Sequence, residues 1–209
     1  MYIRPAIEED LKAIVEIYNS TIDSRVATAD TRPIEVESRL SWFHDRDVTC
    51  RPIWVVDINP KIAQSEVTGI EKLGDRKIVN LFARRSQKPV VAWLSFNDFY
   101  GRPAYKYTAE ISLYVAKDYR GQGIADGLVK KAITECPKLR IKSLLAFVFG
   151  HNIPSVQLFA KHGFTRWGLL PQVAEMDKQE RDLLILGRRI KAPSVVEGSF
   201  NRRAGDPKE

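Results

Sequence analysis

The stretch from Val115 to Ala125 constrains the fold of this chain more than any other segment. It joins a run of alternating apolar and polar residues, typical of a strand, to an amphipathic run typical of a helix. Gly121 and Gly123 open that helix, and backbone N–H groups at such a turn point toward an anion. The segment therefore predicts an α/β domain with an anion-binding loop between a strand and a helix.

The spacing of the two glycines excludes two common nucleotide sites. A P-loop requires a Lys-Ser/Thr pair after its second glycine, and no such pair follows Gly123. A dinucleotide fingerprint requires a third glycine three positions later, where this chain carries Asp126. The glycines alone are equally compatible with an ordinary turn that starts a helix.

Three ordered motifs resemble one known family. Residues 120–125 (Arg-Gly-Gln-Gly-Ile-Ala) resemble the pyrophosphate loop of the GNAT superfamily of N-acetyltransferases. Residues 105–115 and the Asn-Ile-Pro-Ser segment at 152–155 resemble its phosphinothricin acetyltransferase branch. The resemblance implies the GNAT acyl-CoA N-acyltransferase fold, an α/β domain with a mixed, twisted sheet flanked by helices. It also implies a single domain over residues 1–190.

The same resemblance implies acetyl-CoA as co-substrate and no metal. The loop N–H groups would face the pyrophosphate, and the preceding strand would pair with the pantetheine arm through its backbone, supplying the donor to the thioester oxygen. Asn152 either contacts the pantetheine or caps a helix. The expected coenzyme-binding residues are Leu113, Tyr114, Val115, Arg120, Gly121, Gln122, Gly123, Ile124, Ala125, Asn152, Ser155 and Lys161.

Glu110 is the expected general base. A carboxylate in mid-strand is unusual, and its neighbours on that strand face, Thr108, Ser112 and Tyr114, are all polar. The glutamate of the resembled branch matches it, although the residues alone are also compatible with a solvent-facing side chain. Phe159 stands where many members of the superfamily carry a tyrosine acid, so no general acid is named.

The resemblance implies a small, amino-acid-like amine as acceptor, of the phosphinothricin or methionine sulfoximine type. Arg102 could clamp a carboxylate or phosphinate, because arginine makes bidentate contacts to such groups. Expected acceptor-binding residues are Thr28, Arg102, Tyr105, Tyr107 and Tyr114. A protein or peptide acceptor and a non-catalytic, acetyl-CoA-binding regulator are the alternatives.

Charge and composition limit the binding partners and the cellular compartment that this chain is expected to have. The first 60 residues hold 7 basic and 11 acidic residues, so the net charge of +7 arises from the remainder, where a phosphate-rich coenzyme and a solvated surface explain it. No nucleic-acid module and no membrane-length apolar run is present. Two distant cysteines and the absence of a signal-peptide pattern predict a cytoplasmic protein. A homodimer is expected from the resemblance only.

Periodicity places the other elements. Residues 59–87 are expected to be an insertion, with a strand at 78–82, and residues 191–209 a disordered tail. Strands are predicted at 2–5, 51–56, 90–96, 107–116, 143–149, 165–170 and 181–186, and helices at 7–21, from Pro33 onward, from Ala125 to Pro137 and at 154–162.

Overall fold

The computed structural model describes residues 1–58 and 89–190. The expected insertion at 59–87, its strand at 78–82 and the expected tail at 191–209 lie outside the described residues. The strands are β1 (Tyr2–Pro5), β2 (Ile53–Asp57), β3 (Val90–Asp98), β4 (Thr108–Val115), β5 (Ser143–Phe149), β6 (Thr165–Met176) and β7 (Gln179–Arg189). The helices are α1 (Leu11–Asn19), α2 (Leu40–His44), α3 (Ile124–Glu135) and α4 (Ile153–Lys161).

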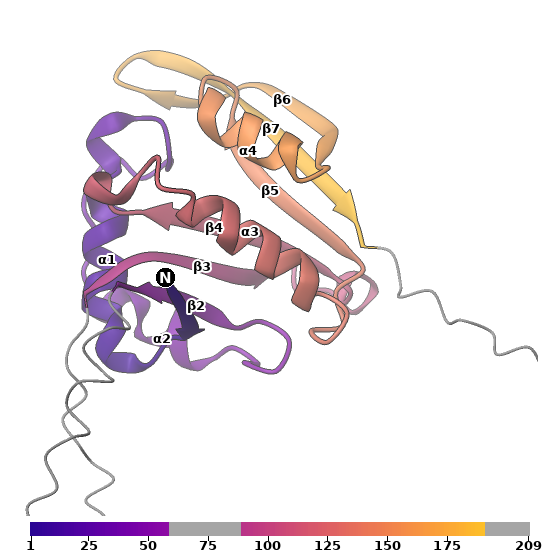
Figure 1. Ribbon diagram of the computed structural model, residues 1–209. Coiled ribbons are helices and arrows are strands. Elements are labelled where there is room, and N and C mark those ends of the chain that lie inside the picture. The colour runs from indigo at the N-terminus through magenta and orange to yellow at the C-terminus, as the bar shows by residue number, and fades with distance from the viewer. Residues whose placement is uncertain (59–88, 191–209) are drawn as a thin grey trace, which may run out of the picture.

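The described strands form one mixed sheet in the order β1-β2-β3-β4-β5-β7-β6. The β4–β5 pair is parallel, and the other neighbouring pairs are antiparallel. Pairing between β4 and β5 covers only Thr108 to Glu110 on β4 and ends at the Glu110–Leu145 pair. Beyond this point the two strands diverge, and β5, β7 and β6 fan away from β4 (Figure 1).

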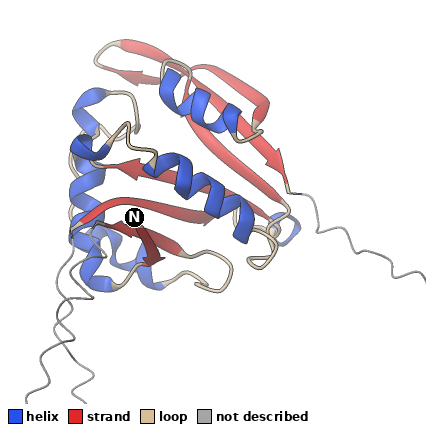
Figure 2. Ribbon diagram, viewed as in Figure 1, coloured by secondary structure: helices blue, strands red, loops and turns tan. Residues whose placement is uncertain are grey.

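Helices cover both faces of the sheet. The face covered by α3 and α4 (Figures 1 and 2) contains the larger core, in which Leu128 and Val129 of α3 pack with Leu94 and Ile111 of the strands. On the opposite face α1 packs against β2 and β3 in a smaller cluster. Because successive residues of a strand point to opposite faces, Glu110, Ser112 and Tyr114 of β4 share the α1 face.

Most elements match the sequence prediction, but the second helix starts later than expected. A helix was predicted from Pro33, whereas a short 3-10 turn at Glu37–Arg39 leads into α2 at Leu40. The reason lies in α1. Asn19 donates to the carbonyl of Ile34 at 2.9 Å and accepts from its N–H at 3.0 Å. Both backbone groups of Ile34 are thereby engaged, and neither is available to a helix.

Strand β6 is longer than the predicted 165–170, because it continues past Pro171 through an irregularity between Leu170 and Ala174. Gln172 has a φ of 52°, and its N–H is held by Asp182 at 2.8 Å. No helix in the described ranges is both long and apolar enough to cross a membrane.

Candidate active site

The predicted anion loop lies between β4 and α3. Gly121 and Gly123 have φ angles of 73° and 77°, a region that other residues rarely adopt. A Cβ at either glycine would meet no atom within 4 Å, so the backbone conformation is what requires glycine here. Gly123 is the residue before the first turn of α3, whose N–H groups have no partner within the helix.

Side chains of the loop brace the loop itself. Arg120 donates from Nε to the carbonyl of Val115 at 3.1 Å, and Gln122 donates to the carbonyl of Asp118 at 3.1 Å. Both contacts fold the loop back toward the end of β4. The backbone N–H groups at the start of α3 are therefore left to face outward.

Lys161, expected to contact the coenzyme, lies at the end of α4 beside the first turn of α3. Its Nζ is 2.6 Å from Asp126 Oδ1, and His162 Nε2 lies 3.1 Å from the same oxygen. The hydrogen bond from Lys161 is the main reason that the pKa of Asp126 lies below its usual range. The structure thus places Lys161 near the start of α3, with its charge paired with Asp126.

Asn152 caps α4 and also ties two distant segments together. Its side-chain oxygen accepts from the N–H of Ser155 at 3.2 Å, while its Nδ2 donates to the carbonyl of Val26 at 3.1 Å. The neighbouring ring of His151 lies 2.9 Å from the carbonyl of Arg25. The start of α4 therefore holds the loop that follows α1.

Glu110 lies at the point where β4 leaves β5. It pairs with Leu145 on one side and with Asn97 of β3 on the other. The side chain is partly buried, and this burial raises the pKa of its carboxyl group. A carboxylate with a raised pKa is a stronger base, which suits proton abstraction near neutral pH.

Beyond Glu110, the residues of β4 pair with β3 but not with β5. Leu113 and Val115 point toward the α3 face and pack on its core. Tyr114 points to the α1 face, where it stacks on Trp93 at a ring distance of 4.7 Å. The edge of β4 that faces β5 is thus free of strand pairing over Ile111 to Val115.

The predicted acceptor-binding residues fall into two groups. Thr28 is buried and lies 2.5 Å from the hydroxyl of Tyr18, beside Tyr114. Arg102, Tyr105 and Tyr107 lie instead in or beside the exposed loop before β4. These three do not line the pocket described next.

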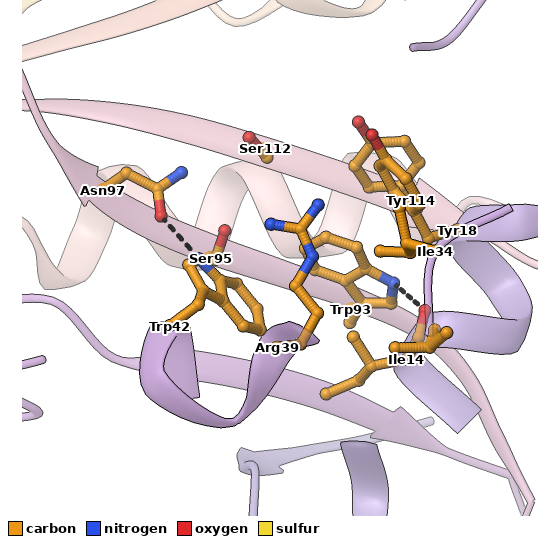
Figure 3. A pocket seen from close by; sticks show the side chains of 11 residues that line it. Ile14, Tyr18, Ile34, Arg39, Trp42, Trp93, Ser95, Asn97, Ser112 and Tyr114 are labelled. Atoms are coloured by element: carbon orange, nitrogen blue, oxygen red, sulfur yellow. Dashed lines mark hydrogen bonds between the residues drawn. The ribbon is translucent and has the colours of Figure 1, made fainter. Parts of the chain in front are cut away.

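A pocket of about 140 Å³ opens on the α1 face beside Ser112 and Tyr114 (Figure 3). We call it the aromatic pocket. Its lining residues are Ile14, Val15, Tyr18, Ile34, Arg39, Trp42, Trp93, Ser95, Asn97, Ser112 and Tyr114.

Sequence reasoning missed most of this lining. The strand predicted at 90–96 is confirmed and is buried from Val91 to Phe96, and Trp93, Ser95 and Asn97 of this strand share the face that holds the pocket. The signal was present in the polar residues at every second position. Phe159, which cannot act as a general acid, is buried and packs on Phe164 with ring centroids 5.0 Å apart.

Residues 33–164 match the family model described as the acetyltransferase (GNAT) family. The chain belongs to this family. It is 44% identical to YwnH of Bacillus subtilis, named as a candidate phosphinothricin acetyltransferase, over 91% of this chain and 99% of that protein. The chain is therefore an N-acetyltransferase of the phosphinothricin acetyltransferase-like branch.

Two further relatives extend the comparison. An L-methionine sulfoximine/L-methionine sulfone acetyltransferase of Salmonella typhimurium is 29% identical, over 83% of this N-acetyltransferase and 85% of that enzyme. The crystal structure of a phosphinothricin acetyltransferase from Sinorhizobium meliloti in complex with acetyl-CoA has the same fold. It superposes with a TM-score of 0.71 at 21% identity and covers 96% of this chain and 94% of that one.

Proposed function

We propose that this N-acetyltransferase transfers the acetyl group of acetyl-CoA to the amine of a small, amino-acid-like acceptor, with Glu110 as general base. One observation carries the proposal. Glu110 lies where β4 separates from β5, on the face that holds the aromatic pocket, and the same strand leads directly into the glycine loop. A coenzyme and an acceptor could therefore meet beside a single partly buried carboxylate.

The loop at residues 120–125 supports coenzyme binding. The N–H groups of Gln122, Gly123, Ile124 and Ala125 would bind the pyrophosphate at the positive end of α3, with Gly121 supplying the turn and Arg120 adding charge. The acetyl-CoA complex of the Sinorhizobium meliloti enzyme, which has the same fold, supports this choice of co-substrate.

The free edge of β4 would receive the pantetheine arm along Leu113 to Val115 as if it were an added strand. Asn152 would contact the pantetheine arm and Ser155 the coenzyme phosphates from the start of α4, where the N–H of Ser155 donates to the side chain of Asn152. Lys161 would reach the phosphates by exchanging its partner Asp126.

The reaction requires three events. Glu110 accepts a proton from the acceptor's ammonium group, which frees the nitrogen lone pair. That nitrogen attacks the thioester carbonyl carbon, while a backbone N–H near Tyr114 stabilises the developing negative charge on oxygen. The C–S bond then breaks, coenzyme A leaves as a thiolate, and the second proton of the former ammonium passes from the amide nitrogen to that thiolate or to water. A thiol with a pKa of about 8.5 needs no protein acid near neutral pH, which accommodates Phe159.

A small acceptor is supported by the size of the aromatic pocket, and by the substrates in the name of the Salmonella typhimurium relative. Tyr114 would contact the acceptor in the pocket, and Thr28, which contacts the pocket residue Tyr18, would contact it from beside that ring. Arg102, Tyr105 and Tyr107 would contact it from the exposed loop before β4.

A cytoplasmic homodimer is proposed as the working form. Edge strand β6 exposes the apolar side chains of Trp167, Leu169, Leu170 and Val173, which a second copy of the chain would cover. Both cysteines are free thiols, as in a reducing compartment. Light scattering during size-exclusion chromatography would measure the mass of the assembly.

The test of the proposed activity is thiol release with acetyl-CoA and a panel of amino acids, their oxidised analogues and short peptides. Glu110→Gln should lower kcat about 10²–10⁴-fold, the usual contribution of a general base. The dissociation constant for acetyl-CoA should stay near the wild-type value. No turnover with any amine would refute the activity, and an unchanged rate in Glu110→Gln would refute the base.

A further inference from the structure

The polar groups of the aromatic pocket are mainly hydrogen-bond donors. Asn97 shows this best, because its side-chain oxygen accepts from Trp42 Nε1 at 3.3 Å and from Arg46 Nη2 at 3.1 Å. These two donors fix the orientation of the amide. Its NH₂ group therefore lies on the side away from Trp42 (Figure 3).

Ser95 provides a second donor without a partner. The residue is 1% exposed, and its Oγ makes no hydrogen bond to any described residue. Leaving a buried hydroxyl unpaired is costly, and such groups in native proteins normally bind water or a ligand. Ser112 lies directly opposite on β4 and also lines the pocket.

Arg39 brings a positive charge to the same place. Its guanidinium lies 5.5 Å from the ring centre of Tyr18 and 5.7 Å from that of Trp42, and it points toward the two strands (Figure 3). Its nearest carboxylate oxygen, on Asp30, is 4.0 Å away, which is too far for a hydrogen bond. The two rings hold the planar fork of Arg39 in position, ready for an oxygen-bearing anion.

The rest of the lining is apolar. Apolar groups of an acceptor would pack against Ile14, Val15, Ile34 and the rings of Trp93 and Tyr114. The pocket begins next to Glu110, because Ser112 follows it by two residues on the same face, a separation of about 6.7 Å along a strand. The strand register places Asn97 directly opposite Glu110, Ser95 opposite Ser112 and Trp93 opposite Tyr114. The site thus suits an amine at Glu110, side-chain oxygens beside Asn97 and Ser95, and a terminal apolar group against Trp93 and Tyr114.

We propose that the aromatic pocket binds the side chain of the acceptor, and that Arg39, Ser95 and Asn97 contact side-chain oxygens such as those of a sulfone, sulfoximine or phosphinate. This inference rests on the proposed function in placing the amine at Glu110. Arg39 is accordingly a specificity-determining residue, distinct from the exposed Arg102.

The kinetic test compares three amines: L-methionine sulfone, L-methionine, and 3-(methylsulfonyl)propan-1-amine, which keeps the sulfone but lacks the carboxylate. Arg39→Met should lower kcat/KM about 10–150-fold for both sulfones, the range for a hydrogen bond to a charged group, and less than 3-fold for L-methionine. The KM for acetyl-CoA should change less than 2-fold. Arg32→Met, at an exposed position, is the matched control and should behave as wild type.

Two more variants guard against a folding defect. Arg39→Lys keeps the charge but not the planar guanidinium group. Its kcat/KM for the sulfones should fall at least 5-fold. In Ser95→Ala, kcat/KM for the sulfones should fall about 3–10-fold. The unfolding free energy should not fall, because the change removes an unpaired buried hydroxyl. Equal losses for sulfone and thioether overturn the proposal, as does a loss confined to amines that carry a carboxylate.

Binding without the coenzyme separates this proposal from the proposed activity. Two of the four tryptophans, Trp42 and Trp93, line the pocket, so L-methionine sulfone should change the intrinsic fluorescence. The change should require higher ligand concentrations in Arg39→Met. Binding without turnover would refute the activity and leave the pocket assignment standing. Turnover of the sulfone, with equal affinity for it in wild type and Arg39→Met, would support the activity and refute the pocket assignment.

Discussion

Asn152 joins α4 to the loop after α1, and its replacement offers a quantitative test. Asn152→Ala removes the helix cap, worth about 1 kcal/mol. It also leaves the carbonyl of half-buried Val26 without its donor, worth about 1–3 kcal/mol. The unfolding free energy should therefore fall by roughly 2–4 kcal/mol, which corresponds to about 4–16 °C in Tm for a domain of this size.

Asn152→Ser separates the two contributions. Serine is an equally good helix cap, but it is too short to reach the carbonyl of Val26, so only the second loss should remain. Urea unfolding followed by circular dichroism measures both variants. In both, the KM for the acceptor should rise, because the loop at 25–28 borders Tyr114 and is no longer anchored. Equal destabilisation by alanine and serine, or a loss below 1 kcal/mol for alanine, would show that this account of Asn152 is wrong.

Three further outcomes are expected. Gly123→Ala forces an alanine to a φ of 77° and should cost about 1–2 kcal/mol in urea unfolding, with a raised KM for acetyl-CoA; a change below 0.5 kcal/mol would contradict this. Asp126→Asn frees Lys161 and removes a negative charge from the start of α3, so the KM for acetyl-CoA should fall roughly 2–5-fold in steady-state kinetics. Burial raises the native pKa of Glu110, so kcat/KM should fall as pH drops through that value. The buried charge also costs stability as pH rises from about 4.3 through the native pKa. Glu110→Gln should therefore unfold at higher urea than wild type at pH 7, and not below pH 4.

The sequence predicted the strands and the glycine turn around the site better than the residues that line the pocket. The bounds of β1 and β5 and the glycine turn before α3 follow from local rules, namely alternation, continuous apolarity and positive φ. The family followed from three motifs that each lie within a short stretch of chain. Glu110 was predicted as the base because it matches the glutamate of the resembled branch, and a carboxylate in mid-strand is unusual.

What the sequence did not predict depends on contacts between distant segments. Asn19 holds Ile34 in a non-helical conformation from 15 residues away, and no local signal shows this. Asn97 lines the aromatic pocket because two residues of the α2 region, Trp42 and Arg46, bind one side of its amide. Arg39 lines the same pocket because the packing of the α2 region brings it over the rings of Tyr18 and Trp42.

The divergence of β4 and β5 at Glu110 has a kinetic consequence. The glycine loop leads into the helix that covers one face of the sheet, whereas the aromatic pocket opens on the other. With the coenzyme and the acceptor bound as proposed, each would bind and dissociate from its own face of the sheet, and neither would block the release of the other. Initial-rate lines at varied concentrations of both substrates should then intersect, and each product should inhibit without a compulsory order of release.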